Sequence, residues 1–543
     1  MVFARRSTTL LAAIIASCAM VLSLTACTSD NKTVVDGQTT VTSNSAGGVA
    51  VFTPSDGITL NQQMPLNKWA KLVPDLAKAL ADAGFKKGDI DHTTSDSLAK
   101  QSRAIQDFVV DHLSNNTTDD SGIAIAPDNM TLLVAPVVEA DASTRQYGDY
   151  ISQNLSTNDV TDEGATSDGE SSEDDSSKDD SSNTESDSTA SDEQAQAVDR
   201  LVSSLKLAKE SGMHVVLLGN SIEGYKPDAF VKFSDAQTIG KLQAEKMVSK
   251  LKLDKASKDN PKYIEVLLPY TAMDEKGNAN DSTFAQEAFR GIWQVLGSYY
   301  QKGVVESPSG TLDGKSTEND WQAVAYDAAK EGSTAKVLDK RLAKTDGQST
   351  LTRIDGIITM NDYIASEVVK ELDDLGYTGS AADINPQITI SGIVGNITGK
   401  KDLSRDAVPD PIKSPENDNA NDSSSSDDDA DEDTSASDKD RDSQWPLVTG
   451  YGAYVSNIPS IVNGKQWMTG MEDRQTIATD IAQACAKLNK DEALNSMPSI
   501  RNSEVGGVKK IPTISEPLLA VSASNLKSAL IDPGYISLAD AGL

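Results

Sequence analysis

Cysteine, histidine and basic residues are all scarce in this chain of 543 residues. Its three cysteines cannot build a disulfide framework or a cysteine-based zinc site, because both need pairs or clusters. The three histidines lie far apart in the sequence, which argues against a multi-histidine metal centre. The chain has 49 lysines and arginines against 82 aspartates and glutamates, so its net charge is −33. Nucleic-acid-binding proteins neutralise phosphates with clustered basic residues, so we expect no nucleic-acid partner.

Recognisable catalytic motifs are also missing from the sequence. The segment nearest to a phosphate-binding G-x-x-x-x-G-K-[ST] loop, residues 395–401, is one residue short and lacks the Ser or Thr. The sequence has no G-x-S-x-G nucleophile elbow and no H-E-x-x-H zinc motif. We therefore expect a protein that is not an enzyme and that needs no metal or other cofactor.

Long apolar runs are limited to residues 10–24, which follow Arg5 and Arg6. This length is typical of a signal-peptide core and is short for a membrane-spanning helix. The run ends at Cys27 in Leu-Thr-Ala-Cys, which resembles the bacterial lipobox. The resemblance implies a signal peptide over residues 1–26, lipidation of Cys27, a flexible tether over 27–47 and anchoring on the outer face of the cell membrane. Cys485 then has no partner, and its helical surroundings predict a buried structural thiol.

Most of the negative charge lies in two Ser-rich segments, residues 159–193 and 401–443. These segments contain few large apolar side chains, so burial cannot offset the entropy of ordering them. We therefore predict two disordered inserts. Neither insert has the residue spacing of a calcium-binding loop.

Outside the inserts, short apolar runs alternate with segments of helical period. Predicted strands, rich in Val, Ile and Leu as in strands buried on both faces, are residues 49–52, 123–126 or 131–137, 214–219, 263–268, 354–360 and 388–392. Amphipathic helices are predicted over residues 69–80, 198–205 and 364–375, each followed by a glycine that can end it. This alternation predicts an α/β fold built from parallel βαβ units, with helices on both faces of the sheets.

Several motifs occur in a fixed order along the chain: Lys68-Trp69, Phe233-Ser-Asp235, Asn361-Asp362, residues 464–473 and residues 526–535. This order resembles the type I periplasmic binding proteins of sugar ABC transporters, and most closely their xylose- and multiple-sugar-binding branch. The resemblance implies two Rossmann-like lobes with parallel sheets, joined by three hinge crossovers, with the ligand in the cleft between them.

The resemblance also implies the boundaries of the lobes. Lobe 1 is expected to comprise residues 48–228 and 394–508, and lobe 2 residues 229–393. Residues 509–543 are expected to form a C-terminal crossover segment that returns to lobe 2. The hinges would then lie near residues 224–231, 393–396 and 506–511.

Sugar proteins of this family stack aromatic rings on the sugar and direct polar side chains to its hydroxyls. The resemblance implies that Trp69, preceded by Lys68, and Trp321 hold the two faces of the sugar. Trp293 lies within a predicted helix and is expected in the core. The remaining candidate contacts with the ligand are Asn361, Asp362, Asn280, Asp281 and Asp235. For Asp235, a role as a helix N-cap is equally consistent with the sequence.

Three positions depart from the family pattern. Asn220 replaces an arginine, Val394 replaces an aspartate, and Glu472 stands where a lysine is common. Loss of the arginine and its facing carboxylate removes the usual charged clamp on the sugar. We keep Asn220 among the candidate ligand contacts, but xylose itself is not expected. A different pentose, a hexose, a short glycoside and weakened binding all remain open.

These features predict a monomeric, lipid-anchored solute-binding protein that captures a small sugar and delivers it to an ABC permease in the membrane. The alternative is a sensory or cell-surface receptor that uses the same fold with a changed ligand, which the altered polar positions would explain. A hydrolase is the third and weakest hypothesis.

Overall fold

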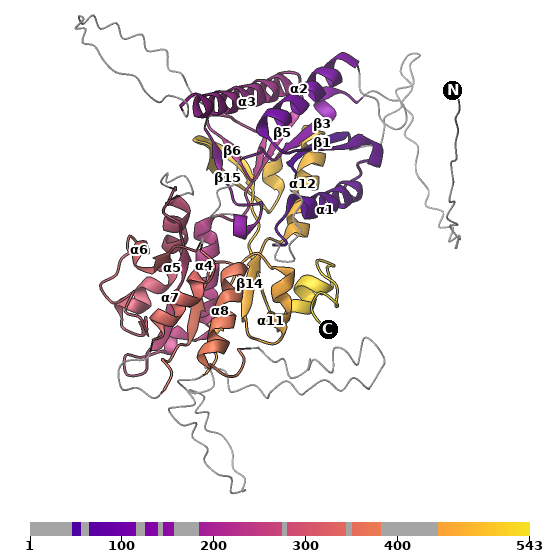
Figure 1. The fold of residues 1–543 in the computed structure, drawn as a ribbon. Helices are drawn as coiled ribbons and strands as arrows, with labels where there is room; N and C mark the ends of the chain where they lie inside the picture. Colours follow the sequence, from indigo (N-terminus) through magenta and orange to yellow (C-terminus); the bar gives the residue numbers. More distant parts are fainter. Residues whose placement is uncertain are drawn as a thin grey trace, which may run out of the picture. The chain divides into compact units, whose positions relative to one another are not determined.

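The computed structural model describes residues 46–55, 65–115, 125–138, 145–156, 184–273, 280–328, 330–343, 350–381 and 444–543. Their strands form a seven-stranded sheet, a four-stranded sheet and three two-stranded pairs (Figure 1). The signal peptide, Cys27, Val394, the strand predicted at 388–392 and the insert at 401–443 lie outside the described residues. No helix among the described residues has the length and apolar character needed to cross a membrane.

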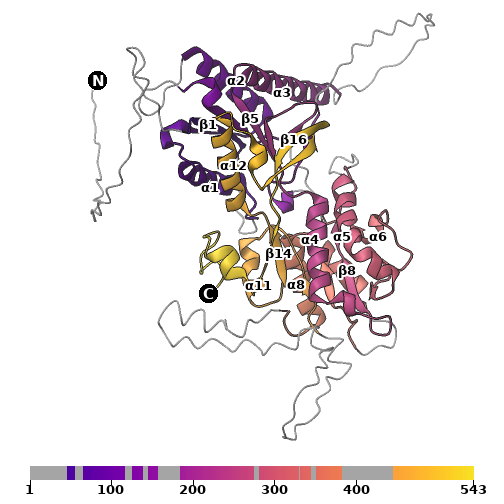
Figure 2. The same ribbon diagram turned by 180° about the vertical axis from the view of Figure 1, so that it is seen from behind.

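The seven-stranded sheet has the order β15-β16-β7-β5-β3-β1-β2 and is parallel except for β15, which pairs antiparallel with β16. Figure 2 shows its strands β1, β5 and β16 from behind. Its strands are β1 (Gly48–Pro54), β2 (Ile90–Ser95), β3 (Met130–Val134), β5 (His214–Leu218), β7 (Ala229–Val231), β15 (Ile500–Val505) and β16 (Val508–Ile514). Of the two alternatives for the second predicted strand, 123–126 and 131–137, the structure has the one near residue 131. The small pair joins β4 (Asn154–Leu155), which precedes β5 in the chain, with β6 (Ser221–Ile222), which follows it.

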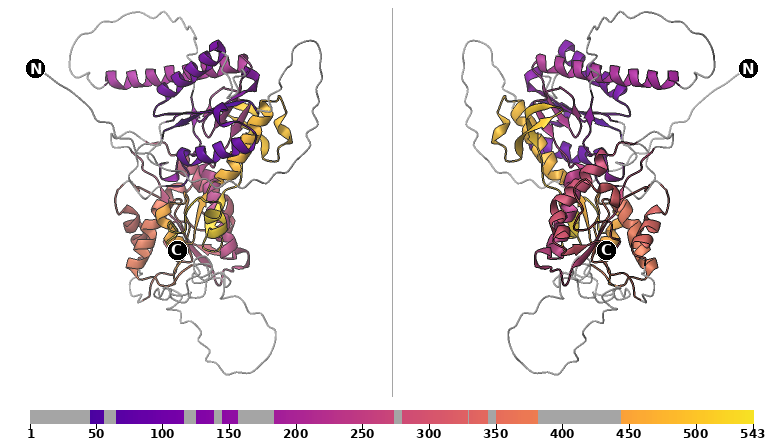
Figure 3. Two further views of the ribbon diagram at one scale, coloured as in Figure 1. Left: turned by 90° about the vertical axis from the view of Figure 1, so that its right-hand side faces the viewer. Right: turned by 90° about the vertical axis from the view of Figure 1, so that its left-hand side faces the viewer.

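Helices cover both faces of this sheet (Figure 3). Val49 and Val51 of β1 pack with α1 (Trp69–Asp82) and α12 (Arg474–Leu488). Ala50 and Phe52 point to the other face, where they pack with α2 (Leu98–Asn115) and α3 (Thr184–Glu210). This alternation is the two-residue period of a strand buried on both sides. Cys485 is fully buried in α12, as predicted.

The four-stranded sheet has the order β10-β8-β12-β13, and all of its pairs are parallel. Its strands are β10 (Val305–Glu306), β8 (Lys262–Val266), β12 (Gly356–Ile358) and β13 (Leu447–Val448). The helices of its core are α4 (Ala236–Lys250), α5 (Thr283–Gln301), α6 (Trp321–Val324), α7 (Ser333–Arg341) and α8 (Asp362–Leu375). Trp293 is buried in this core, as predicted. The remaining elements are β9 (Leu268–Pro269) with β11 (Ala325–Tyr326), β14 (Met468–Met471) with β17 (Leu519–Ser522), α11 (Ile458–Val462) and a π-helical turn at Lys527–Ile531.

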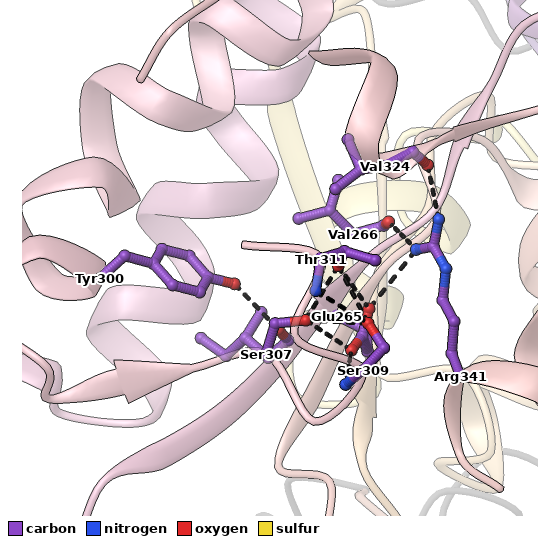
Figure 4. Close-up of polar contacts among 9 residues, drawn as sticks. Glu265, Val266, Tyr300, Ser307, Ser309, Thr311, Val324 and Arg341 are labelled. Atoms are coloured by element: carbon purple, nitrogen blue, oxygen red, sulfur yellow. Dashed lines mark hydrogen bonds and ion pairs between the residues drawn. The ribbon is translucent and has the colours of Figure 1, made fainter. Parts of the chain in front are cut away.

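A buried carboxylate on β8 links the four-stranded sheet to the segment after β10 and to α7 (Figure 4). Glu265 of β8 accepts hydrogen bonds from the Ser307 hydroxyl at 2.7 Å and the Ser309 amide at 2.8 Å. Arg341 of α7 lies 3.4 Å from the same carboxylate and also donates to the Val266 carbonyl at 2.5 Å. The charge of Glu265 is thus paired and hydrogen-bonded, which a fully buried ion requires.

The chain passes between the two sheets three times. Residues 232–235 connect β7 to α4, residues 472–473 connect β14 to α12, and residues 515–518 connect β16 to β17. The α/β class with two parallel sheets and three crossovers is therefore confirmed.

The predicted positions of the crossovers need correction. β13 pairs with β12, so residues 447–448 belong to the four-stranded sheet although the 394–508 segment was assigned to lobe 1. The second crossing comes only after β14, at residues 472–473, rather than at 393–396. Residues 506–511 form the turn and start of the β15–β16 hairpin, so the third crossing comes later. The first crossing follows β7, which pairs with β5 in the seven-stranded sheet.

The three predicted helical segments, 69–80, 198–205 and 364–375, lie within α1, α3 and α8. Gly84 follows α1 with φ +99°, and Gly376 caps α8 with φ +94°. Both angles are in the left-handed region that glycine adopts without strain. In contrast, α3 begins at Thr184, so the last part of the acidic segment 159–193 is helical and the predicted insert is too long at that end.

Candidate functional site

The carboxyl ends of the two sheets meet at one short segment, residues 145–156, which we name the strap. Asn220 follows β5, and its side-chain oxygen accepts from the Gln153 amide at 2.9 Å. Asn361 follows β12, and its Nδ2 donates to Gln146 Oε1 at 3.0 Å. Ligands of open α/β sheets bind at the carboxyl ends of the strands. The strap therefore marks the region where a ligand site is expected.

Lys68 and Trp69 open α1 beside the strap. The Lys68 ammonium lies 2.6 Å from Asp149 Oδ1, and Asp149 Oδ2 accepts from the Trp69 amide at 3.1 Å. The Asp149 amide in turn donates to the Asn67 carbonyl at 2.8 Å. A carboxylate at a helix N-terminus satisfies a free amide and interacts favourably with the helix dipole. Asp149 thus holds the strap against the start of α1.

The ring of Trp69 belongs to a buried aromatic cluster. Its centroid lies 5.0 Å from that of Tyr150 and 5.7 Å from that of Phe233, both in edge-to-face geometry. Tyr150 and Phe233 stack on each other at 4.6 Å, and the Tyr150 hydroxyl donates to the Lys68 carbonyl at 2.6 Å. Trp69 is only 3% exposed. In this conformation its ring packs with the strap and with the first crossover.

Asn361 and Asp362 start α8 but have different surroundings. Asn361 caps the helix, because its Oδ1 accepts from the Ile364 amide at 2.9 Å, and its Nδ2 is directed to the strap. The Asp362 carboxylate is completely buried and accepts from Gln466 Nε2 at 2.7 Å and Thr469 Oγ1 at 2.8 Å. The Tyr454 amide donates to it as well, at 2.9 Å. Asp362 is therefore held behind Asn361 by contacts within the protein, and its role as a ligand contact stays a prediction.

Two further candidates form local hydrogen bonds at the starts of helices. Asp235 accepts from the amide of Thr238 at 2.7 Å and from its hydroxyl at 2.6 Å, so it is the N-cap of α4. Asp281 makes the corresponding contacts with Thr283, at 2.9 and 2.7 Å, just before α5. The structure thus supports the capping alternative for Asp235 and gives Asp281 a similar local role.

Asn280 and Trp321 lie around Tyr270, not beside Trp69. The Trp321 ring contacts Tyr270 edge-to-face at 5.1 Å and is 9% exposed. The Tyr270 hydroxyl donates to the Asn280 carbonyl at 3.2 Å, and Asn280 Nδ2 donates to the Thr271 carbonyl at 2.9 Å. Both residues therefore lie beside Tyr270 and away from Trp69. Among the described residues, no two tryptophans face each other as a sandwich for a sugar.

Sequence reasoning missed a buried polar cluster at the crossovers. Glu472 Oε1 accepts from the Ser234 amide at 2.7 Å and from the Ser234 hydroxyl, which also lies 2.6 Å from the Tyr451 hydroxyl. The Glu472 amide donates to Asn67 Oδ1 at 3.4 Å. Burial raises the pKa of Glu472 to about 7, against the opposing effect of its hydrogen bonds to Ser234. The only sequence signal was that Glu472 departs from the family pattern.

The described residues contain no group of three or more His, Cys, Asp or Glu side chains that could hold a metal ion. The chemistry available at the site is instead that of amides, hydroxyls, one compensated lysine and aromatic rings. Such groups exchange hydrogen bonds with neutral polar molecules and pack against their apolar faces.

Comparison with protein-family models and with curated proteins gives no match. Solved structures do align with most of the chain. A solute-binding protein of an ABC transporter from Clostridium phytofermentans, with bound β-D-glucose, is 18% identical with a TM-score of 0.44, covering 91% of this chain and 99% of its own. A carbohydrate-transporter protein from Chloroflexus aurantiacus, in complex with D-glucose, is 18% identical with a TM-score of 0.42, covering 92% and 98%. An arabinose-binding protein from Geobacillus stearothermophilus is 10% identical with a TM-score of 0.41, covering 89% and 99%.

Proposed function

We propose that this chain is a solute-binding protein that captures a monosaccharide or small sugar between its two lobes and delivers it to an ABC-type importer. The observation that supports the proposal is the convergence of Lys68, Trp69, Asn220 and Asn361 on one segment at the carboxyl ends of both sheets. Three crossovers join the sheets, as expected of a protein that closes on a ligand by hinge motion.

The side chains favour a neutral ligand with many hydroxyl groups. The side-chain amides of Asn220 and Asn361, which bind the strap in this conformation, can bind a hydroxyl in its place. The ammonium of Lys68, which faces the Asp149 carboxylate at 2.6 Å in this conformation, is a further donor for a hydroxyl. Trp69 and Phe233 provide apolar ring surface of the kind that packs on the C–H face of a sugar ring. A sugar fits this set of hydrogen-bonding groups and ring surface.

The membrane anchor is part of the same proposal and rests on the sequence around Cys27. Lipidation there would hold the protein on the outer face of the membrane, next to the permease that it supplies. One acyl chain gives only marginal attachment, and the two chains of a bacterial lipoprotein give a stable one.

The test is a thermal-shift and tryptophan-fluorescence screen of residues 28–543 with D-glucose, D-xylose, L-arabinose and D-ribose. A sugar at 100 times its Kd should raise stability by about 2.7 kcal/mol, which is a shift of a few degrees in Tm. Lys68→Met should weaken this response. Lys100→Met is the matched control, because Lys100 pairs with Asp96 at 2.7 Å on the exposed face of α2.

The absence of any response across the panel would contradict the sugar-binding proposal. It would favour the sensory or cell-surface alternative, in which the same lobes receive another kind of ligand. An equal loss in Lys68→Met and Lys100→Met would show that the effect is not local to the site.

A further inference from the structure

From Asp149 onward, the strap is attached to the part of the chain that holds the seven-stranded sheet. Asp149 binds Lys68 and the Trp69 amide, and the Asp149 amide reaches the Asn67 carbonyl. Further along, the Gln153 carbonyl accepts from the Ser221 amide at 2.9 Å, and β4 pairs in parallel with β6. The strap thus runs from the start of α1 to the loop after β5.

The beginning of the strap is attached to the other sheet. The Gln146 carbonyl accepts from the Tyr454 hydroxyl at 2.6 Å, and its side chain accepts from Asn361. Tyr147 is 1% exposed and belongs to the core cluster of the four-stranded sheet, with its ring 4.7 Å from that of Phe284. One stretch of chain therefore bonds with both lobes.

These contacts use the same groups that the proposed function assigns to the sugar. Asn361 is fully buried, Asn220 is 7% exposed, and Trp69 is 3% exposed against Tyr150. A sugar cannot reach the Trp69 ring or the Asn361 amide while Tyr150 and Gln146 are in place. The strap and a sugar therefore cannot bind these groups at the same time.

The fit of the strap is not complete. The Ser152 hydroxyl and Asn67 Nδ2 are buried without a hydrogen-bond partner among the described residues. Ser152 belongs to the strap, and Asn67 lies next to it, because the Asn67 carbonyl accepts from the Asp149 amide. A buried polar group without a partner costs free energy. A bound strap that leaves such groups unsatisfied is less tightly held than its number of contacts suggests.

We propose that the strap is an internal competitor of the ligand: it bridges the lobes in the free protein and leaves Lys68, Trp69, Asn220 and Asn361 when a sugar binds. The inference rests on the proposed function and adds its regulation. The apparent affinity for the sugar then equals the intrinsic affinity multiplied by the fraction of molecules in which the strap is released.

The test compares two double variants of the full chain by calorimetric titration with the same four sugars. Gln146→Ala with Tyr150→Phe removes two strap hydrogen bonds, to Asn361 and to the Lys68 carbonyl, and keeps the Tyr150 ring. Gln286→Ala with Tyr299→Phe is the matched control, because it removes hydrogen bonds to Ser282 and Asp254 on and near α5. We expect about tenfold tighter binding in the strap variant and no change in the control.

Hydrogen exchange provides a second readout. The amides of Asp149 and Gln153 donate to Asn67 and Asn220, so a peptide covering 145–156 should exchange faster when the wild-type protein is saturated with sugar. Equal affinity in wild type and strap variant, with unchanged or slower exchange in this peptide, would overturn the inference and leave the proposed function intact.

The remaining outcomes separate the two proposals. Binding by the strap variant alone would support the inference, since the strap then blocks the wild-type site. No binding by either form would overturn the proposed function and the competition together.

Discussion

Asp362 illustrates how a single buried carboxylate determines the geometry of the candidate site. Both of its oxygens are used: Oδ1 accepts from Gln466, and Oδ2 accepts from Thr469 and Tyr454. Burial raises the pKa of Asp362 to about 6, and the hydrogen bonds from Tyr454, Thr469 and Gln466 oppose that rise. By fixing the start of α8 against residues 454–469, Asp362 directs the adjacent Asn361 amide to the strap.

Replacing this carboxylate by an amide should be costly. In Asp362→Asn an NH₂ group must face a donor, either Gln466 Nε2 or the pair formed by Thr469 and Tyr454. We expect a loss of about 1–3 kcal/mol in the free energy of unfolding at neutral pH, measured by chemical denaturation. Asp373→Asn is the control on the same helix, because Asp373 forms an exposed pair with Lys465 and should lose less than about 1 kcal/mol. Equal losses in both variants would refute this role of Asp362.

The packing of α4 on α5 depends on two glycines. A Cβ on Gly240 would lie 2.2 Å from the Ala288 carbonyl oxygen, and a Cβ on Gly291 would lie 2.0 Å from the Gln237 carbonyl oxygen. Each helix thus presents a glycine to the backbone of the other. This close approach positions α4, whose N-terminus follows the first crossover, on the four-stranded sheet.

Gly240→Ala should destabilise the protein although alanine favours helices. Helix propensity alone predicts a gain of about 1 kcal/mol for glycine to alanine. The clash with backbone that cannot rotate away should outweigh it and give a net loss of about 1–3 kcal/mol. The measurement is the denaturation midpoint, with Lys246→Ala on the exposed side of α4 as the control. A gain in stability for Gly240→Ala would show that the helices can separate without cost.

Glu472 connects distant parts of the whole molecule. It lies on the second crossover and binds Ser234 of the first, while its amide reaches Asn67 at the start of α1. Tyr451, which follows β13 of the four-stranded sheet, has its hydroxyl 2.6 Å from that of Ser234. Two crossovers and both lobes therefore meet at one buried carboxyl group.

This position predicts a specific dependence of stability on pH. The pKa of Glu472 rises from an ordinary value of 4.5 to about 7 in the folded protein, so between these values the folded state binds more protons than the unfolded state. Its stabilising contribution is complete below about pH 4.5 and is lost as the pH rises to about 7. The loss should amount to about 3 kcal/mol.

Glu472→Gln should remove this part of the pH profile, because glutamine keeps an acceptor for Ser234 and does not titrate. The measurement is the free energy of unfolding of both proteins between pH 4 and 8, and the difference between the two curves isolates Glu472. Asp362 also has a raised pKa, but its effect is common to both proteins and cancels. A pH-independent difference would contradict the assignment.

Local sequence patterns determined the fold class and much of the secondary structure. The apolar spacing of Leu72, Leu76 and Leu80 placed α1, and the alternation of buried runs with helices indicated parallel sheets. The cap of α4 by Asp235 and the end of α8 at Gly376 could also be predicted. Such features depend on residues within one or two turns of each other, so a sequence displays them directly.

Tertiary structure alone decided the crossovers and the strap. β10 and β13 are two-residue strands whose partners lie far away in the chain, so no local period reveals them. The Gln146 and Asn361 side chains meet across 215 residues of sequence. The sequence predicted that Lys68, Trp69, Asn220 and Asn361 share one region, but not that residues 145–156 cover them. Which group satisfies a buried amide is set by what lies beside it in space, and sequence spacing does not contain that information.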